Sequence, residues 1–317
     1  MKACKCNNTL DNTGVGCVPI FAVTKKIILV PYFDSNGSVN QLDLSTVTGP
    51  GYLDDAFFSA LVNQADGSKR WFPLPEMKNI KDERGDDLYE SFDDQTKMFI
   101  NQGIRAFSGL ILRKDASPIL LGKLKAARCV PVGIYIIDKD GNLIGSESQE
   151  GYLAPIRVEE DTFSVKWVKT GDKNVQAINL AFEFHIDEND EDLRMISSQE
   201  MTANLNLLKG LLDVRVVYSG ISVTGVTAKL TTDFGTLLNP VEVEGLLVSD
   251  VAARNVTTSA SISLTGTGSS FTESAPGVYN IVYKTTDDPA TTNVVKLTFT
   301  KAGFDFSEVN STTFVTP

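Results

Sequence analysis

Short runs in which apolar and polar residues alternate occur along the whole chain, and Gly, Asp, Asn and Pro residues separate them. A repeat of two residues is typical of a β-strand with one buried face. In the first two thirds of the chain the predicted strands are Val18–Val23, Lys25–Phe33, Lys69–Phe72, Leu88–Phe92, Lys97–Ile100, Arg105–Leu112, Val132–Ile137, Ser164–Val168 and Val175–Ile186. After Val214 they are Val214–Tyr218, Thr227–Leu230, Val241–Val243, Ala260–Leu264, Gly277–Tyr283 and Val294–Phe299. The pattern predicts a mainly β protein.

One stretch in the first part of the chain follows a helical period instead. Between Tyr52 and Asn63 the apolar residues stand at positions 53, 57, 58, 61 and 62, which form a single stripe on a helix. Asp54 and Asp55 would lie in its first turn, where the helix dipole favours negative charge. The spacing therefore predicts a short helix over Tyr52–Asn63.

A second helix is predicted at Ile119–Arg128. Ser117 is a favoured N-cap residue, Pro118 is suited to the first helical position, and basic residues lie toward the C-terminal end. Pro131 then ends the helix. With these helices covering one face of a sheet, the first part of the chain is expected to be a β-sandwich or barrel-like sheet with one or two short helices.

The composition changes near residues 210–215. All four Cys, both Trp and the single His precede this point, and Thr/Val/Ser-rich text with frequent turn residues follows it. We expect an extended N-terminal arm over residues 1–17, a β domain over 18–213, an antiparallel β-sandwich over 214–306 and a C-terminal tail over 307–317. The arm has too few large apolar residues to bury itself, so it is expected to become ordered only against a neighbouring subunit.

The chemistry of catalysis is scarce in this sequence. His185 is the only histidine, and alternation places it with Glu183 on a solvated strand face, opposite Phe182, Phe184 and Ile186. No nucleophile elbow, P-loop or dinucleotide-binding glycine pattern occurs. The sequence predicts no enzyme, no catalytic residue, no cofactor-binding residue and no cofactor.

Three groups of residues resemble parts of metal sites. Cys4, Cys6 and Cys17 offer three thiols for zinc but lack a fourth ligand at the usual spacing, which favours free or partner-packed cysteines. Asp138–Asn142 opens like a calcium loop, but its Gly is two positions early, so a hairpin turn is favoured. The acidic run Asp187–Asp192 could hold calcium loosely, and a solvated loop is the simpler interpretation. We therefore predict no metal site.

Charge and hydropathy restrict the partners. The formal net charge is −11, so the surface as a whole repels nucleic acid and anionic membranes. The longest apolar run, Ile27–Phe33, is far shorter than a membrane span, and no secretion signal or lipid-anchored Cys4 is expected at the N-terminus. Few, clustered cysteines indicate synthesis in a reducing cytoplasm. No membrane partner and no specific nucleic-acid binding are predicted.

Two stretches resemble known families. Leu88–Phe99, an aromatic strand with a polar turn, is followed by a long strand with the pattern Gly103–Gly109 (Gly-x-x-x-Phe-x-Gly). This arrangement resembles the central hairpin of bacteriophage tail-tube and related ring-forming virion proteins, and the helix and strand that follow come in the order of that family. Val214–Lys301 resembles the bacterial immunoglobulin-like domains of phage tail and capsid proteins, with Gly277-Val278-Tyr279 similar to their late-strand Tyr motif. The N-terminal cysteines and Tyr52–Trp71 depart from a minimal tube protein.

The resemblance implies a structural virion protein of a tailed phage. Identical subunits would form a ring or tube in the tail or neck, next to other tail, neck or portal proteins, and DNA would pass through the lumen. The immunoglobulin-like domain would decorate the outside and make weak contact with the host surface or glycans. The alternative is a cell-surface adhesion or carbohydrate-binding module, for which Trp71 and Trp167 are the exposed-aromatic candidates.

Overall fold

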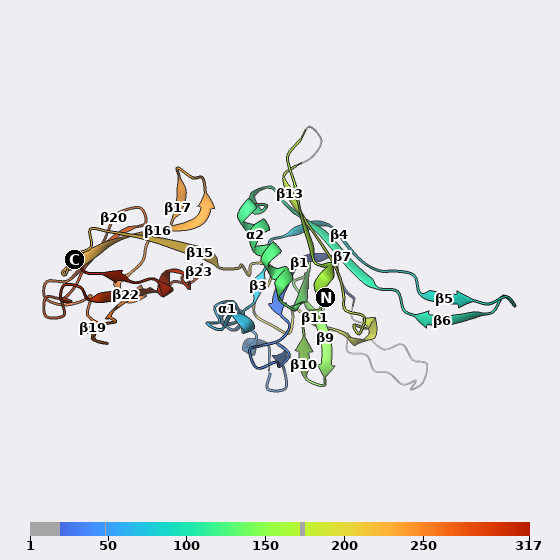
Figure 1. Cartoon of the computed structure of the whole chain (residues 1–317). Coiled ribbons are helices and arrows are strands. Elements are labelled where there is room, and N and C mark those ends of the chain that lie inside the picture. Colours follow the sequence, from blue (N-terminus) through green and yellow to red (C-terminus); the bar gives the residue numbers. More distant parts are fainter. Residues whose placement is uncertain (1–19, 48, 172–174) are drawn as a thin grey trace. The chain divides into compact units, whose positions relative to one another are not determined.

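The computed structural model describes residues 20–47, 49–171 and 175–317, so the predicted N-terminal arm and Cys4, Cys6 and Cys17 lie outside the described residues. Within these described ranges the protein is mainly β, with 43% strand and two α-helices, which confirms the predicted fold class (Figure 1). The chain divides into two compact units. The first ends at Gly210, and the second is Leu211–Pro317.

The first unit contains a curled, half-barrel sheet of eight strands in the order β2-β10-β9-β8-β1-β3, with β11 beside β8 and β14 beside β9. A second sheet has the order β12-β13-β7-β4, and β5 and β6 form a separate pair. The strands are β1 Thr24–Pro31, β2 Leu42–Asp43, β3 Phe72–Pro73, β4 Met77–Arg84, β5 Leu88–Ser91, β6 Lys97–Asn101, β7 Arg105–Leu112, β8 Val132–Asp138, β9 Leu143–Gln149, β10 Tyr152–Ala154, β11 Ile156–Arg157, β12 Ser164–Val168, β13 Ala177–Glu183 and β14 Leu193–Ile196; the helices are α1 Asp55–Val62 and α2 Pro118–Ala126.

The core of this unit lies between its two larger sheets. Alternate residues of β1 and β8, such as Ile27 and Ile134, belong to the same buried cluster as Phe107 and Ile111 of β7 and Leu180 of β13. Because side chains of one strand face are two residues apart, each strand contributes every second residue to this core. The alternation in the sequence is therefore the pattern of a sheet-on-sheet sandwich.

Strands β1 and β8 are buried on their other face as well. Tyr135 of β8 is fully buried and stacks on Trp71 with 4.7 Å between ring centroids, and Trp71 in turn contacts Phe58 of α1 at 5.9 Å. Trp71 was expected to be exposed, but only 3% of it is accessible. The prediction was wrong because β1 and β8 are apolar and buried on both faces, so the second face also needs cover, and the segment that includes α1 supplies it. Trp167 is partly buried against the core.

Both predicted helices are present. The Asp54 carboxylate accepts a hydrogen bond from the Phe57 amide at 2.7 Å and caps α1. The Ser117 hydroxyl accepts one from the Leu120 amide at 3.0 Å and caps α2, whose first residue is Pro118. Each cap satisfies an amide that has no partner inside the helix. Both helices are slightly shorter than predicted, and α2 passes into a 3-10 turn at Ala127–Cys129.

Several predicted strands differ from the structure. The described part of Val18–Val23 is not strand, and Lys69–Phe72 is largely a turn that reaches strand only at Phe72. The predicted strand Val175–Ile186 is shorter in the structure, where β13 covers only Ala177–Glu183. Strand β4, with the sequence MKNIKDER, was not predicted, because it is the edge of its sheet and half of its residues are exposed. An edge strand needs little apolar alternation, so its sequence carries a weak signal.

The second unit consists of two sheets around its own core. One has the order β20-β21-β16-β15-β23, with β17 beside β16, and the other has the order β19-β18-β22-β24. Residues from both sheets, including Ala228, Ile281 and Leu297, form one buried cluster. The strands are β15 Leu212–Ser219, β16 Gly225–Gly235, β17 Pro240–Glu242, β18 Val251–Asn255, β19 Ser261–Ile262, β20 Ser270–Ala275, β21 Val278–Val282, β22 Val294–Phe299, β23 Phe304–Asp305 and β24 Phe314–Val315.

Residues 307–317, expected as a tail, belong to this sandwich. Strand β24 pairs with β22, Phe314 is buried in the core, and the buried Thr316 hydroxyl donates a hydrogen bond to the Ala290 carbonyl at 2.6 Å. A strand of two residues with one buried side chain leaves little pattern in the sequence, which is why it was taken for a tail.

Tyr279, in the predicted late-strand motif, links the strand β21 to a neighbouring loop. Its hydroxyl donates to the Val243 carbonyl at 2.7 Å and accepts from the Leu246 amide at 3.2 Å, and the side chain is fully buried. We expect Tyr279→Phe to lower the free energy of unfolding by about 1–3 kcal/mol, because two buried backbone groups lose their partner. Tyr283 is equally buried, but its hydroxyl makes no hydrogen bond among the described residues.

Tyr283→Phe is therefore the matched control, expected to be nearly neutral. Urea unfolding of the two variants measures the difference. Equal losses for both would contradict the role assigned to the Tyr279 hydroxyl.

Candidate assembly surface

Strands β5 and β6 form a hairpin that extends away from the rest of the first unit (Figure 1). We call residues 86–103 the arm; this segment is distinct from the predicted N-terminal arm over residues 1–17. Every residue of both strands is exposed. The turn at its tip is closed by Asp94, whose carboxylate accepts hydrogen bonds from the Thr96 amide at 3.0 Å and the Thr96 hydroxyl at 2.5 Å. These bonds lower the pKa of Asp94, so the turn is held by an ionised carboxylate.

Both faces of the arm carry exposed apolar side chains. Tyr89 and Phe99 are cross-strand partners on one face, with ring centroids 5.8 Å apart. Met98 and Ile100 lie two residues apart on β6 and so share the other face. Leu88, Tyr89, Phe92, Met98, Phe99 and Ile100 are each between 46% and 58% exposed. Apolar groups concentrated on a protruding element mark an interaction site, since their contact with water is unfavourable.

The strand edges of the arm are also available. Among the described residues, β5 and β6 pair only with one another, so the outer edge of each strand carries backbone groups that no other strand satisfies. A two-stranded hairpin is marginally stable in water, and an exposed edge is a template for another strand. The arm therefore has three features of an element that a neighbouring molecule covers: apolar faces, free edges and little intrinsic stability.

The base of the arm is a close approach of two backbone segments. A Cβ atom placed on Gly103 would lie 2.0 Å from the Gly85 carbonyl oxygen and 2.7 Å from that of Asp86. The Gly85 amide donates to the Ile104 carbonyl at 2.9 Å, which joins the two segments beyond the last pair of β5 and β6. Only glycine fits at position 103, so the sequence fixes where the arm leaves the sheet.

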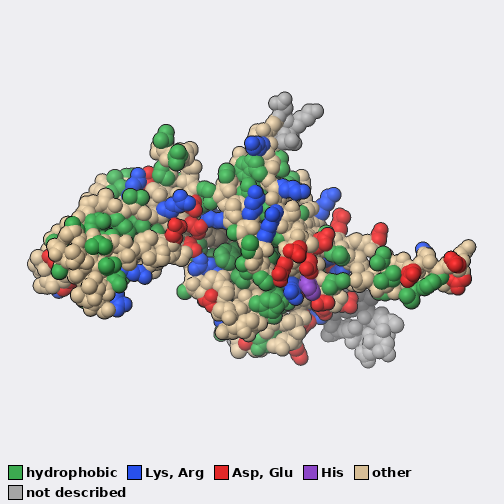
Figure 2. All heavy atoms as spheres, viewed as in Figure 1, with side chains coloured by type: hydrophobic (Ala, Val, Ile, Leu, Met, Phe, Trp, Pro, Cys, Tyr) green, Lys and Arg blue, Asp and Glu red, His purple; other side chains and the backbone are tan. Residues whose placement is uncertain are grey.

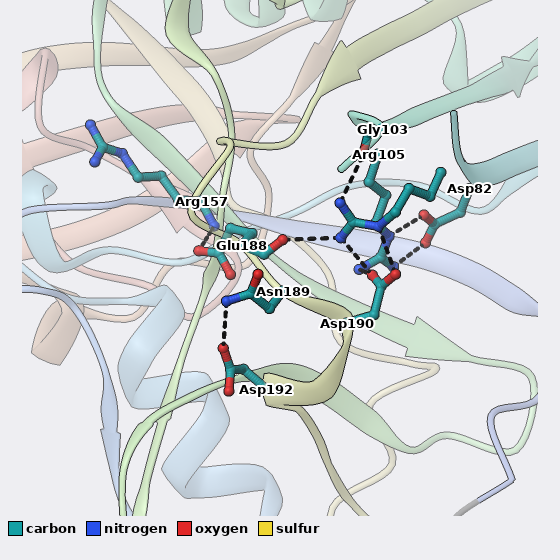
Figure 3. A network of polar contacts seen from close by, with 9 residues as sticks. Asp82, Gly103, Arg105, Arg157, Glu188, Asn189, Asp190 and Asp192 are labelled. Atoms are coloured by element: carbon teal, nitrogen blue, oxygen red, sulfur yellow. Dashed lines mark hydrogen bonds and ion pairs between the residues drawn. The ribbon is translucent and has the colours of Figure 1, made fainter. Parts of the chain in front are cut away.

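Arg84 connects this base to the acidic loop at Asp187–Asp192. Its partners Gly103, Glu188 and Asp190 are labelled in Figure 3. Its guanidinium donates to the two carboxylate oxygens of Asp190 at 2.7 and 3.0 Å, to the Gly103 carbonyl at 2.9 Å and to the Glu188 carbonyl at 3.0 Å. A two-point contact of this kind holds both partners in one orientation. Arg84 therefore fixes the arm to a loop that is about 100 residues away in the sequence.

Arg105, at the start of β7, completes the network (Figure 3). It donates to both oxygens of Asp82 at 2.6 Å, approaches Asp190 at 3.7 Å, and lies over the Phe184 ring at 4.6 Å. The side chains of Arg105 and Asp82 are only 12% and 17% exposed, so this pair is shielded from solvent. Two arginines and two aspartates thus clamp the strands β4 and β7 where they enter the arm.

The acidic run is consequently more than the solvated loop that we predicted. The hydrogen bond from Arg84 lowers the pKa of Asp190, whereas burial raises the pKa of Glu188, whose carboxylate accepts from the Arg157 amide at 2.8 Å. Because its folded-state pKa is lowered, Asp190 contributes stability above its ordinary pKa and loses it as the pH falls through the lowered value. Solvent screens this effect, since the Asp190 side chain is about half exposed.

The other candidate residues have structural surroundings. Phe182 and Phe184 are buried as predicted, but Ile186 is 55% exposed, because β13 ends at Glu183 and the chain turns. His185 is half-buried, with its Nδ1 3.4 Å from Asp187 and its Nε2 3.8 Å from Glu159. It therefore lies among carboxylates and not on the open strand face that we predicted.

The segment Asp138–Asn142 is the hairpin turn that the sequence favoured. The buried Asp138 carboxylate accepts from the Asn142 amide at 2.9 Å and from the Asn142 side chain at 2.7 Å. Within the described ranges no cluster of three or more His, Cys, Asp or Glu residues could hold a metal ion. Cys129 is exposed.

No protein-family model matches this chain, and no curated protein is significantly similar to it. In the part of the chain that the structure describes, no helix is long and apolar enough to cross a membrane.

Proposed function

We propose that this chain is a structural virion protein of a tailed bacteriophage and not an enzyme, and that identical subunits assemble through the arm into a ring or tube of the tail or neck. The observation that carries the proposal is the arm itself. It protrudes, carries exposed apolar side chains on both faces and has two strand edges that no other described strand pairs with. An element of this kind gains stability when neighbours add strands to its edges and cover its faces.

A repeated arm-to-neighbour contact suits a ring. A heterologous interface, in which one surface of a subunit meets a different surface of the next, closes into a ring when the rotation permits. The net charge of −11 then serves a second need, because DNA passing through the lumen must not adhere to the wall. Other tail, neck or portal proteins would be the partners at the two ends. The second unit would decorate the outside and make weak contacts with the host surface or glycans.

The adhesion or carbohydrate-binding alternative has lost support. It requires a shallow platform of exposed aromatic side chains, and Trp71 and Trp167 were its candidates. Trp71 lies beneath the α1 segment against Tyr135, and Trp167 packs partly against the core. Three of the exposed aromatic residues, Tyr89, Phe92 and Phe99, lie together on the arm, where they favour protein contact.

Electron microscopy and sedimentation of the purified chain test the proposal. Discs, rings or tubes are expected, and a chain ending at Gly210 is expected to form assemblies of the same symmetry, since the second unit has its own core. A chain that stays monomeric at high concentration, also with phage tail proteins present, would contradict the proposal.

A further inference from the structure

The helix α2 and the turns beside it form a basic surface in an acidic protein. Residues 113–130 contain five Lys or Arg and one Asp, a net charge of +4 in a chain of net charge −11. Lys125 and Arg128 are exposed here, and Lys166 is exposed on β12, against which α2 packs. Lys and Arg side chains gather over α2 in Figure 2. We call Lys123, Lys125 and Arg128, with the small or apolar exposed residues Gly122, Ala126 and Val130, the basic surface.

The arm has the opposite character. It carries five acidic residues and one Lys, a net charge of −4, and its acidic and hydrophobic side chains appear together in Figure 2. Glu90 is on β5 and Asp93 at the tip, and both are exposed. The two surfaces therefore have opposite charge, and each combines charge with exposed apolar area. Complementary charge of this kind selects a partner and its register.

The two surfaces lie at opposite ends of one strand. The arm joins β7 at Arg105, and the chain reaches α2 after β7 ends at Leu112. Eight residues of strand at about 3.3 Å each separate the two ends by about 26 Å. The arm also points away from α2 (Figure 1). An arm cannot reach the basic surface of its own subunit without leaving the sheet, so the complementary surface it can reach belongs to another copy.

We propose that the arm of one copy docks on the basic surface of the next copy, in a head-to-tail interface. This inference rests on the proposed function and specifies its contact. The apolar faces of the arm supply the buried area. Glu90 and Asp93 lie near Lys125 and Arg128 of the neighbour and fix the orientation. Because donor and acceptor are different surfaces, each subunit uses both, and the contact repeats around a ring.

Charge reversal in pairs tests the contact. One variant carries Glu90→Lys and Asp93→Lys, a second carries Lys125→Glu and Arg128→Glu, and a third carries all four changes. Each pair is expected to raise the protein concentration needed for half-assembly by about tenfold or more, since like charges then face each other. The fourfold variant is expected to regain most of this loss. Sedimentation velocity of the full chain at low salt measures the protein concentration needed for half-assembly in each variant.

The controls separate a lost contact from a damaged fold. The control variant carries Lys139→Glu and Lys209→Glu, at two other exposed positions of the first unit. It makes the same charge change as the variant with Lys125→Glu and Arg128→Glu, and it is expected to leave assembly unchanged. Thermal unfolding should be alike for all variants. Raising the salt concentration should weaken wild-type assembly, because the Debye length falls from about 10 Å at 0.1 M to about 3 Å at 1 M.

The outcomes distinguish this inference from the proposed function. Suppose that the wild-type chain assembles. The inference alone is then overturned if either charge pair has no effect on assembly, or if the fourfold variant assembles no better than the variants with one pair. A wild-type chain that does not assemble overturns the proposed function and this contact with it. Recovery in the fourfold variant supports both.

Discussion

Replacing Tyr89 and Phe99 with Ser should abolish assembly while leaving the subunit folded. The two side chains are 50% and 54% exposed, so little of their burial belongs to the subunit itself. Covering the exposed half of each aromatic side chain is worth about 2–3 kcal/mol in the assembly. Losing both corresponds to a weakening of about 1,000-fold or more per contact. Sedimentation and electron microscopy measure assembly, and urea unfolding measures the subunit.

Tyr52→Ser provides the control for this experiment. Tyr52 is 51% exposed in the same unit but lies outside the arm. Its replacement should leave assembly unchanged. If the Tyr89 and Phe99 variant assembled as well as the wild type, the arm would not be the surface through which subunits associate.

Gly103→Ala should disrupt the base of the arm. The new Cβ would lie 2.0 Å from the Gly85 carbonyl oxygen and 2.4 Å from its carbon, both backbone atoms that cannot move aside like a flexible side chain. We expect the free energy of unfolding to fall by about 3 kcal/mol, at the upper end of overpacking effects, or the arm to detach from its clamp and assembly to be lost. Urea unfolding and sedimentation measure the two effects.

Gly85→Ala is the matched control. A Cβ at Gly85 would have its nearest contact at 3.5 Å, with the Ile104 carbonyl oxygen, which is an ordinary van der Waals distance. This variant should remain stable and assemble. Similar behaviour of the two alanine variants would show that the close approach at Gly103 is not a constraint.

Much of the fold could be predicted because it depends on local sequence. Strands β7 and β12 have the predicted bounds, and the caps at Asp54 and Ser117 mark the two helices. Alternation and capping act over a few residues, so a single sequence displays them. Among the strands that were missed, the edge strand β4 and the last strand β24 are exposed or short, and such strands need few apolar residues. The buried strand β9 was also missed, because only the start of its sequence LIGSESQ is apolar.

The surroundings of the arm were predictable only in part. The pattern around Leu88–Phe99 located the hairpin, but alternation cannot show that both of its faces are exposed. Trp71 was wrongly placed on the surface, because the strand that it covers is 64 residues away in the sequence. The clamp of Arg84 and Arg105 on Asp190 was missed for the same reason. No local signal distinguishes a carboxylate that will meet a distant arginine from one that stays solvated.

The acidic residues of the arm have a further consequence for the subunit before it meets a partner. An apolar hairpin with open edges can pair with its own kind and start irregular aggregation. Two arms brought edge to edge would place five acidic residues and one Lys of each against the same set, and like charges on adjacent strands repel. These carboxylates therefore act as gatekeepers. Newly made subunits would then accumulate in solution without pairing arm to arm, and the arms would stay available for the basic surface that we propose as their partner.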